Sequence, residues 1–228
     1  PEGGARSDST AKDVFKGAVM EGSVIGNYRV VRKLTEGGMG TVYEVVHDRL
    51  GKRAALKTLH AEFARRPEFV QRLFDEARAV SLVDHPGLVE VFDCGLDENR
   101  VAYILMEYLN GETLGRRLKS LPGQGSGRGR LELPVTLRIA RQIASALAAT
   151  HEKGIVHRDL KPDNVMLVAD PEAPGGERAK LLDFGIAKLR AELTEGEDTR
   201  HVTMTGTLMG TPTYMSPEQC RDAGHVDE

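Results

Sequence analysis

The chain of 228 residues contains no tryptophan and only two cysteines, Cys94 and Cys220. The two thiols lie far apart and in no metal-ligand spacing, which argues against a disulfide framework and against a zinc site. Ordinary reduced thiols are typical of a cytoplasmic protein. No apolar run approaches the ~18 residues of a membrane-spanning helix, since even residues 101–109 are interrupted by Glu107. We therefore expect a cytoplasmic chain with no membrane segment, while the full-length protein could carry an anchor outside it.

The chain also lacks an excess of charge of either sign. Its formal net charge is −3 and its pI is about 6.2, so it offers no large basic surface of the kind that binds nucleic acid. A hydrophobic content of 40% with 29% charged residues instead fits a globular protein, folded as one large domain or as two small lobes. Because the chain begins at Pro1 rather than Met and ends at Glu228 without a closing element, we expect a piece of a longer protein.

The first half of the chain shows mainly strand-like patterns. Residues 1–22 are rich in Gly, Ser and charge without periodicity, which predicts a disordered leader. Residues 67–83 predict a helix, since Pro67 suits a first turn and apolar residues recur at helical spacing. Short runs rich in Val, Tyr and Leu, separated by turn residues, predict strands in an antiparallel arrangement. These runs are 28–34, 40–48, 52–59, 88–94 and 101–108.

The second half of the chain changes in character. A Gly-rich basic stretch at 118–130 predicts a surface loop, and an Ala-rich helix is expected over 134–153. A small hairpin is expected from residues 165–168 and 180–182, around an acidic Pro/Gly insertion at 169–179. This hairpin would bring the end of its second strand beside the start of its first.

One loop concentrates chemistry-bearing residues: His-Arg-Asp-Leu-Lys-Pro-Asp-Asn at 157–164 combines acids, cations and an amide. Loops on a rigid scaffold are where chemistry tends to sit, although such a stretch alone would be interpreted as a solvated turn. Other motifs in a fixed order change that interpretation. They are a Gly-rich turn at 35–43, Ala-Ala-Leu-Lys at 54–57 and Asp-Phe-Gly at 183–185. In this order the four motifs resemble those of the protein kinase family.

The resemblance implies a two-lobed α+β fold. Residues 23–108 would form an N-lobe with an antiparallel sheet and one main helix, and residues 109–228 would form a mainly helical, incomplete C-lobe. Together with Gly-Gly-Met-Gly at 37–40, the motif Tyr-Met-Ser-Pro-Glu-Gln at 214–219 is most similar to bacterial Ser/Thr kinases of the eukaryotic-like type. Family members continue with several helices beyond the position of Glu218, so the kinase domain is expected to be truncated here.

The resemblance also implies an ATP site. Glycines let a backbone approach phosphates and offer amide groups to them, and Lys57 would hold the α and β phosphates while paired with Glu76. Backbone groups of Glu107 and Leu109 would bind adenine, with Met106 gating the pocket behind it. From the residues alone, Lys57 could equally face solvent and Met106 could fill the core. The expected ATP-binding residues are Leu34, Gly37, Gly38, Met39, Gly40, Val42, Ala55, Lys57, Glu76, Met106, Glu107 and Leu109. Thr35 departs from the family pattern, which has glycine there.

The catalytic roles follow from the same resemblance. Asp159 would accept the proton of the substrate hydroxyl and align that hydroxyl with the γ-phosphate. Lys161 would neutralise charge on the phosphoryl oxygens, and a lysine at this position resembles the Ser/Thr-specific kinases. Asn164 and Asp183 would supply the oxygen ligands that Mg²⁺ prefers, with Mn²⁺ as a possible substitute. The implied reaction is transfer of the γ-phosphate of Mg-ATP to Ser or Thr hydroxyls of proteins.

Residues 186–215 form a long threonine-rich segment that is typical of a regulatory loop. We expect phosphorylation at Thr203 or Thr205, in trans between two self-associating copies. The added charge and acceptor oxygens would suit capture by Arg158, whereas Thr211 would contact the catalytic loop and face the substrate. The alternative is that these threonines merely solvate a loop.

Two other functions compete with the protein kinase. A pseudokinase or ATP-binding scaffold would use the fold to hold partners, but it has no electrostatic need for the complete set of catalytic residues. A small-molecule phosphotransferase is disfavoured by the segment at 210–218, which has no role unless a peptide docks there.

Overall fold

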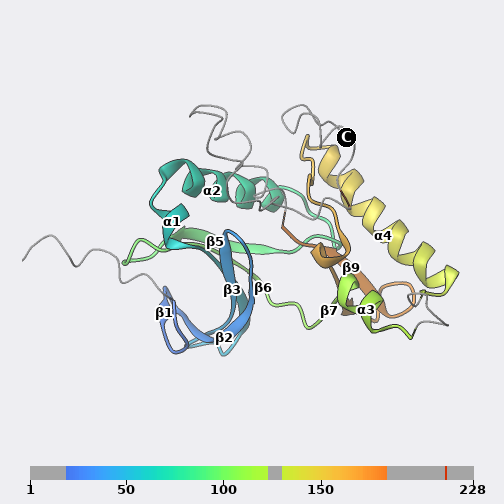
Figure 1. Cartoon of the computed structure of the whole chain (residues 1–228), viewed down its shortest axis with the longest axis horizontal. Coiled ribbons are helices and arrows are strands. Elements are labelled where there is room, and N and C mark those ends of the chain that lie inside the picture. The colour runs from blue at the N-terminus through green and yellow to red at the C-terminus, as the bar shows by residue number, and fades with distance from the viewer. Residues whose placement is uncertain (1–18, 123–129, 184–213, 215–228) are drawn as a thin grey trace, which may run out of the picture.

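The computed structural model describes residues 19–122, 130–183 and 214 (Figure 1). The N-terminal part of this range is built on a six-stranded antiparallel sheet in the order β1-β2-β3-β4-β6-β5. Its strands are β1 (Val24–Ile25), β2 (Tyr28–Glu36), β3 (Gly40–His47), β4 (Arg53–Leu59), β5 (Val91–Leu96) and β6 (Ala102–Glu107). The predicted strands are therefore confirmed, with β5 starting and ending later than expected.

Alternation along the strands gives the sheet two different faces. On β4, Ala54 and Leu56 belong to one apolar cluster, which also holds Leu105 of β6. Leu59 belongs to the other cluster, on the face covered by helices α1 (Ala61–Ala64) and α2 (Pro67–Ser81). Because successive side chains of a strand point to opposite faces, Lys57 shares its face with Leu59. The lysine of the expected site is thus on the helix-covered side of the sheet.

Helix α2 confirms the helix expected over 67–83. Phe69, Leu73 and Ala77 repeat at helical spacing, are at most 3% exposed, and pack with Ile104 of β6. Burial of a Phe or Leu side chain, as at Phe69 and Leu73, stabilises the fold by roughly 1.5–3 kcal/mol relative to exposure. The short helix α1 was not predicted, because four residues are too few to show a helical period.

The C-terminal part contains a three-stranded antiparallel sheet in the order β7-β8-β9 and a long helix beside it (Figure 1). Its elements are β7 (Gly111–Thr113), α3 (Leu114–Ser120), α4 (Leu133–His151), a 3₁₀ turn (Pro162–Asn164), β8 (Val165–Ala169) and β9 (Glu177–Leu181). The predicted helix and hairpin are confirmed. Strand β8 ends at Ala169 and strand β9 begins at Glu177, so the insertion between them is shorter than the predicted 169–179.

Helix α3 corrects part of the loop expected at 118–130. It begins directly after Thr113, whose side-chain oxygen accepts a hydrogen bond from Arg116 N at 3.1 Å. Such an N-cap satisfies a backbone donor that the first turn leaves open. The helix continues to Ser120, and residues 123–129 lie outside the described part of the chain.

The two parts are joined through the segment between α2 and β5. Leu181 N donates to Gly87 O at 2.8 Å, and Leu88 forms an isolated parallel bridge with Leu181. His85 Nε2 and Ser145 Oγ of α4 are 3.0 Å apart. An N-lobe segment therefore extends the small C-lobe sheet, which fixes the second lobe against the first.

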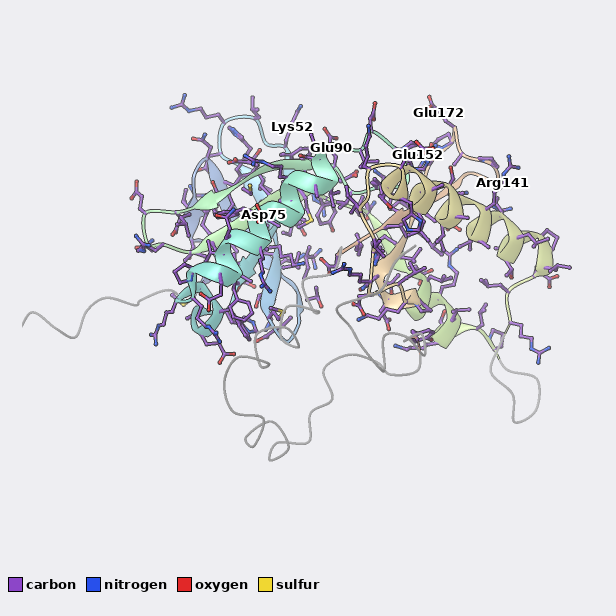
Figure 2. All side chains as sticks on the ribbon, turned by 90° about the horizontal axis from the view of Figure 1, so that it is seen from above. Lys52, Asp75, Glu90, Arg141, Glu152 and Glu172 are labelled. Carbon is purple, nitrogen blue, oxygen red and sulfur yellow. The ribbon has the colours of Figure 1, made fainter. Side chains whose placement is uncertain are left out.

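The chain before β1 makes defined contacts from Val19 onward. Tyr43 OH donates to Val19 O at 3.1 Å, and Gly22 N donates to Val30 O at 2.9 Å. These residues are the end of the segment expected as a leader, and residues 1–18 lie outside the described range. None of the helices within that range has the length and apolar character required to cross a bilayer. Figure 2 shows the side chains of the two lobes, with Asp75 labelled on α2 and Arg141 on α4.

Candidate active site

Four residues expected around ATP lie on one face of the large sheet. Val42 is the Cα partner of Lys57, and Ala55 is the Cα partner of Met106. Directly paired residues of an antiparallel sheet point to the same face, and positions 55 and 57 of β4 share a face by alternation. The register therefore brings Val42, Ala55, Lys57 and Met106 together on one face of the sheet, as expected if this face covers the nucleotide. Met106 is half-buried and also packs against the cluster under α2.

The Gly-rich turn joins β2 to β3. Gly37 N donates to Gly40 O at 2.9 Å and closes the turn, while Met39 O accepts from His60 N. Leu34, Gly37 and Gly38 are exposed. Thr35 is the Cα partner of Val42, which places the residue that departs from the family pattern on the same face as Lys57.

Gly40 is required for a steric reason of its own. A Cβ added there would lie 2.1 Å from Thr58 O, whereas one added at Gly37 would meet nothing closer than Gly40 O at 3.8 Å. We expect Gly40→Ala to lower the free energy of unfolding by about 1–3 kcal/mol, the usual cost of overpacking. Urea denaturation of both variants measures the difference. The matched control Gly37→Ala should change stability by less than half as much, and equal losses in the two variants would contradict the steric reason.

Lys57 forms an ion pair with Asp183, the first residue of the Asp-Phe-Gly motif. The distance from Lys57 Nζ to Asp183 Oδ1 is 2.5 Å. Burial opposes ionisation of Asp183, but the charge of Lys57 and the hydrogen bond from it outweigh this and hold the pKa of Asp183 below its usual range. Glu76 lies on α2 as predicted, and its side chain is outside the described structure, so its pairing with Lys57 stays a prediction.

The catalytic loop is held together by its own side chains. Asp159 Oδ2 accepts from Lys161 Nζ at 2.7 Å and from Asn164 Nδ2 at 2.8 Å. The same Nδ2 donates to Asp159 O at 2.9 Å, and Asn164 is only 8% exposed. Charge-assisted bonds of this kind fix the position of a carboxylate before any substrate arrives. Three of the predicted site residues are thus in direct contact.

His157 joins this loop to the Asp-Phe-Gly motif. Its side chain is 2% exposed, and its Nε2 is 2.9 Å from Leu182 O. Since a carbonyl oxygen can only accept, Nε2 carries the proton, and Nδ1 accepts from Asp159 N at 3.4 Å. Burial is the main cause that lowers the pKa of His157, which favours this neutral form. His157 was in the motif but was not predicted to have a role.

A backbone bond completes the connection between the two motifs. Leu182 N donates to Asn164 O at 2.9 Å, so the residue before Asp183 is bonded to the last residue of the catalytic loop. The hairpin of β8 and β9 makes this possible, because its two strands place residues 165 and 181 opposite each other. The structure therefore brings Asp159, Asn164 and Asp183 to one place, as the sequence predicted.

The side chain of Glu107 has contacts that the sequence analysis did not predict. Its Oε1 accepts from Glu90 N at 2.8 Å and forms an ion pair with Lys180 of β9. Lys180 Nζ also donates to Leu88 O at 3.1 Å. The residue expected to present its backbone to adenine is therefore tied by its side chain to the C-lobe. Leu109, the other expected adenine contact, is half-buried just beyond β6.

The donors at this site fit a hard divalent cation. Both bonds of Asn164 Nδ2 go to Asp159, so its Oδ1 is the atom left to face a cation. Asp183 adds a carboxylate, whose ionised form Lys57 stabilises. Within residues 19–122 and 130–183 no group of three His, Cys, Asp or Glu residues could hold a metal by itself. One carboxylate and one amide oxygen fit Mg²⁺, which takes one or two protein carboxylates and completes its shell with water and substrate phosphates.

The remaining predicted residues divide into two groups. Arg158 is described and has an unusual backbone φ of 61°, which a non-glycine residue keeps only when its surroundings hold it there. Thr203, Thr205 and Thr211 lie outside the described residues.

Comparison with known proteins agrees with this geometry. The chain is 42% identical over 198 residues to the serine/threonine-protein kinase PknA of Mycobacterium tuberculosis, covering 85% of this chain and 41% of that protein. It is 41% identical to the serine/threonine-protein kinase Pkn1 of Myxococcus xanthus, covering 87% of this chain and 26% of that protein. The chain thus spans less than half the length of these relatives.

Solved structures give the same result. The crystal structure of the M. tuberculosis PknI kinase domain is similar with a TM-score of 0.60 and 32% identity, covering 75% of this chain and 62% of that one. Residues 28–228 match the protein kinase domain family. That match includes the Gly-rich turn, Lys57, the loop at 157–164 and Asp183, and the two-lobed fold is that of the family. The chain belongs to the protein kinase domain family.

Proposed function

We propose that this chain is the nucleotide-binding and catalytic part of a serine/threonine protein kinase, which transfers the γ-phosphate of Mg-ATP to hydroxyl groups of protein substrates. The observation that carries the proposal is the convergence of Lys57, Asp159, Asn164 and Asp183 from three separate segments: β4, the loop at 157–164 and the residue that follows β9 by two positions. Phosphoryl transfer requires little covalent work from the protein beyond positioning and charge neutralisation. A cation, a base and two oxygen ligands are the groups needed for both.

Each residue has a distinct part in this mechanism. Asp159 orients the acceptor hydroxyl and takes its proton, and Lys161, 2.7 Å from that carboxylate, is close enough to offset charge on the transferred group. Lys57 binds phosphate oxygens, for which it exchanges its bond to Asp183. Asn164 Oδ1 and Asp183 would hold Mg²⁺, which supplies charge neutralisation at the phosphates.

The direct test is a phosphorylation assay. The full-length protein, supplied with Mg-ATP labelled at the γ-phosphate and a generic basic protein as acceptor, should transfer label to Ser and Thr residues. Phospho-amino-acid analysis of the product distinguishes Ser/Thr from Tyr transfer. Binding of Mg-ATP without any transfer would instead support an ATP-binding scaffold. Transfer to a small molecule alone would support a small-molecule phosphotransferase.

We further propose that the kinase is switched on by phosphorylation of Thr203 or Thr205, in trans between two copies. A phosphothreonine adds about −1.5 to −2 charge and three acceptor oxygens, which suit a guanidinium. Arg158 directly precedes Asp159, so a phosphate bound there would act on the catalytic loop. Arg158 already has an interaction partner, so this docking requires an exchange of partners.

Mass spectrometry tests the switch. Full-length wild-type protein should carry phosphate on Thr203 or Thr205, and the Asp159→Asn variant expressed alone should carry none. The Thr203→Ala/Thr205→Ala double variant should turn over at least about ten-fold more slowly, because its loop has no phosphate to order it. An unphosphorylated wild-type enzyme with full activity would remove the switch from the proposal. Thr194→Ala in the same segment is the matched control.

A further inference from the structure

Tyr108 lies directly between Glu107 and Leu109, the two residues expected to present their backbone to adenine. Its aromatic ring lies beneath the guanidinium of Arg53, with 3.8 Å between Arg53 Cζ and the ring centroid. Its hydroxyl accepts a hydrogen bond from Arg32 Nη2 at 3.4 Å. Two cations from separate strands of the N-lobe thus contact one side chain at the point where the chain leaves the large sheet.

Glu44 fixes both of these cations. Its Oε1 accepts from Arg53 Nε at 2.8 Å, and its Oε2 is 2.8 Å from Arg32 Nη2. The residue is only 6% exposed, which is rare for a glutamate and is tolerated because both carboxylate oxygens are paired. The side chain of a lone arginine samples many rotamers. The buried carboxylate of Glu44 lies between Arg32 and Arg53 and therefore fixes the position of each guanidinium.

Arg32, Glu44 and Arg53 lie on the same face of the sheet as Ala55 and Lys57, the face expected to cover the nucleotide. Glu44 is the Cα partner of Ala55, and Arg53 precedes Ala55 by two positions on β4. Arg32 is in turn the Cα partner of Glu44. Along β4, one face therefore presents Arg53 toward Tyr108 at one end and Lys57 toward Asp183 at the other.

The residue before Tyr108 is held from the opposite side. Glu107 is bonded through its side chain to Glu90 N and to Lys180 of the C-lobe, and through its backbone N to Glu90 O at 2.9 Å. Glu107 is thus tied both to the N-lobe, through Glu90, and to the C-lobe, through Lys180. The side chain of Tyr108, the next residue, contacts the N-lobe arginines Arg32 and Arg53.

We propose that Glu44, Arg53 and Tyr108 form a hinge clamp, a set of positioning residues that holds the backbone of residues 107–109 in the geometry required to bind the adenine ring of ATP. The inference rests on the proposed kinase function, since it assigns these residues to the nucleotide site of that enzyme. Binding groups must be held within about 0.5 Å of the productive position. A segment that must first be ordered by its ligand binds that ligand more weakly.

Calorimetric titration with Mg-ATP tests the clamp in the full-length protein. Loss of a cation over an aromatic ring at a partly exposed site should raise the Kd by about three- to five-fold in Arg53→Met and in Tyr108→Ala. Tyr108→Phe keeps the ring and should stay within about two-fold of wild type. The Arg53→Met/Tyr108→Ala double variant should bind Mg-ATP about as well as Tyr108→Ala, because the substitution at Tyr108 already removes the contact with Arg53.

Kinetics separate positioning from a general loss of structure. The KM for ATP should follow the Kd, while kcat with saturating ATP should stay within about two-fold of wild type, since the clamp acts before chemistry. Arg29→Met is the matched control, because Arg29 is an exposed arginine of the same sheet that makes two bonds to Asp48 and does not contact the hinge clamp. Thermal unfolding of each variant shows whether the fold is retained. If Arg53→Met does not fold, Tyr108→Ala carries the same expectation without leaving a buried carboxylate unpaired.

Three results would overturn the clamp: an unchanged Kd in both single variants, an equal rise in Arg29→Met, or additive losses in the double variant. A wild-type protein that binds Mg-ATP but transfers no phosphate would refute the proposed enzyme and leave the clamp to be judged on the Kd values alone. A wild-type protein that does not bind Mg-ATP would refute both.

Discussion

Asp159→Asn reduces phosphoryl transfer by about 100- to 10,000-fold, the range that a positioned general base contributes. Asparagine has the same shape but cannot take a proton, so the loss comes from chemistry rather than from packing. The carboxylate also receives bonds from Lys161 and Asn164, and a neutral amide leaves Lys161 without its anionic partner. The rate is measured in the full-length protein with saturating Mg-ATP and a basic protein acceptor.

Asp170→Asn is the matched control for this variant. Asp170 is an aspartate of the same lobe that is likewise paired with a cation, Arg178, but it lies in the turn between β8 and β9. This substitution should leave the rate unchanged within about two-fold, as expected away from a functional site. Turnover of Asp159→Asn within a few-fold of wild type, with unchanged circular dichroism, would refute the assigned role of Asp159 and with it the enzymatic proposal.

Lys57→Met lowers kcat/KM by about 100- to 1,000-fold, the usual cost of removing one charge-stabilising donor from an active site. Two effects combine in this variant. The phosphates lose a cation, and Asp183 loses the partner whose charge and hydrogen bond lower its pKa. Because burial then acts on Asp183 with less opposition, the pKa of Asp183 should be higher in the variant than in the wild type.

The sign of the pH effect gives a second readout. In the wild type the lowered pKa keeps Asp183 ionised to a lower pH than in the variant. In Lys57→Met the residual activity should fall at a higher pH than in wild type as the solution is acidified. An acid limb at the same pH in both proteins would contradict the coupling of Lys57 to Asp183.

Lys52→Met controls for the loss of one positive charge from the N-lobe. Lys52 is exposed and precedes β4, whereas Lys57 is 15% exposed within it. Figure 2 shows Lys52 at the edge of the N-lobe side chains. Equal losses of activity in the two lysine variants would mean that net charge, rather than the position of Lys57, is responsible.

Much of the fold could be predicted from local patterns. Runs rich in Val, Tyr and Leu between turn residues predicted the strands at 28–34 and 52–59. Apolar residues at helical spacing predicted α2 and α4, because a helix face that must be buried leaves its period in the sequence. The misses were short elements. Helix α1 has four residues and β7 has three, and α3 was hidden by the Gly-rich stretch that follows it, although Thr113 is an N-cap residue that could have marked its start.

The identity of the chemical groups was also determined by the sequence. Asp159, Lys161 and Asn164 lie within six positions of one another, so a single loop was bound to place them together, and the order of the motifs gave the family. What Lys57 contacts could not be derived from residues 54–57 alone. Strand alternation defines the face of the sheet on which Lys57 lies, but its bond to Asp183 depends on how a residue 126 positions away is placed by the C-lobe hairpin.

Tertiary structure alone decided how the site is supported. His157 reaches Leu182, Glu107 reaches Lys180, and Tyr108 reaches Arg53, each across more than twenty positions of sequence. None of these pairs leaves a periodic or compositional signal, since a buried histidine or an ion-paired glutamate looks the same in sequence as a solvated one. The sequence by itself predicted which groups are proposed to perform the chemistry, because their types and spacing are local. Packing between the lobes determined which side chains hold them in place, because that depends on where separate segments meet in space.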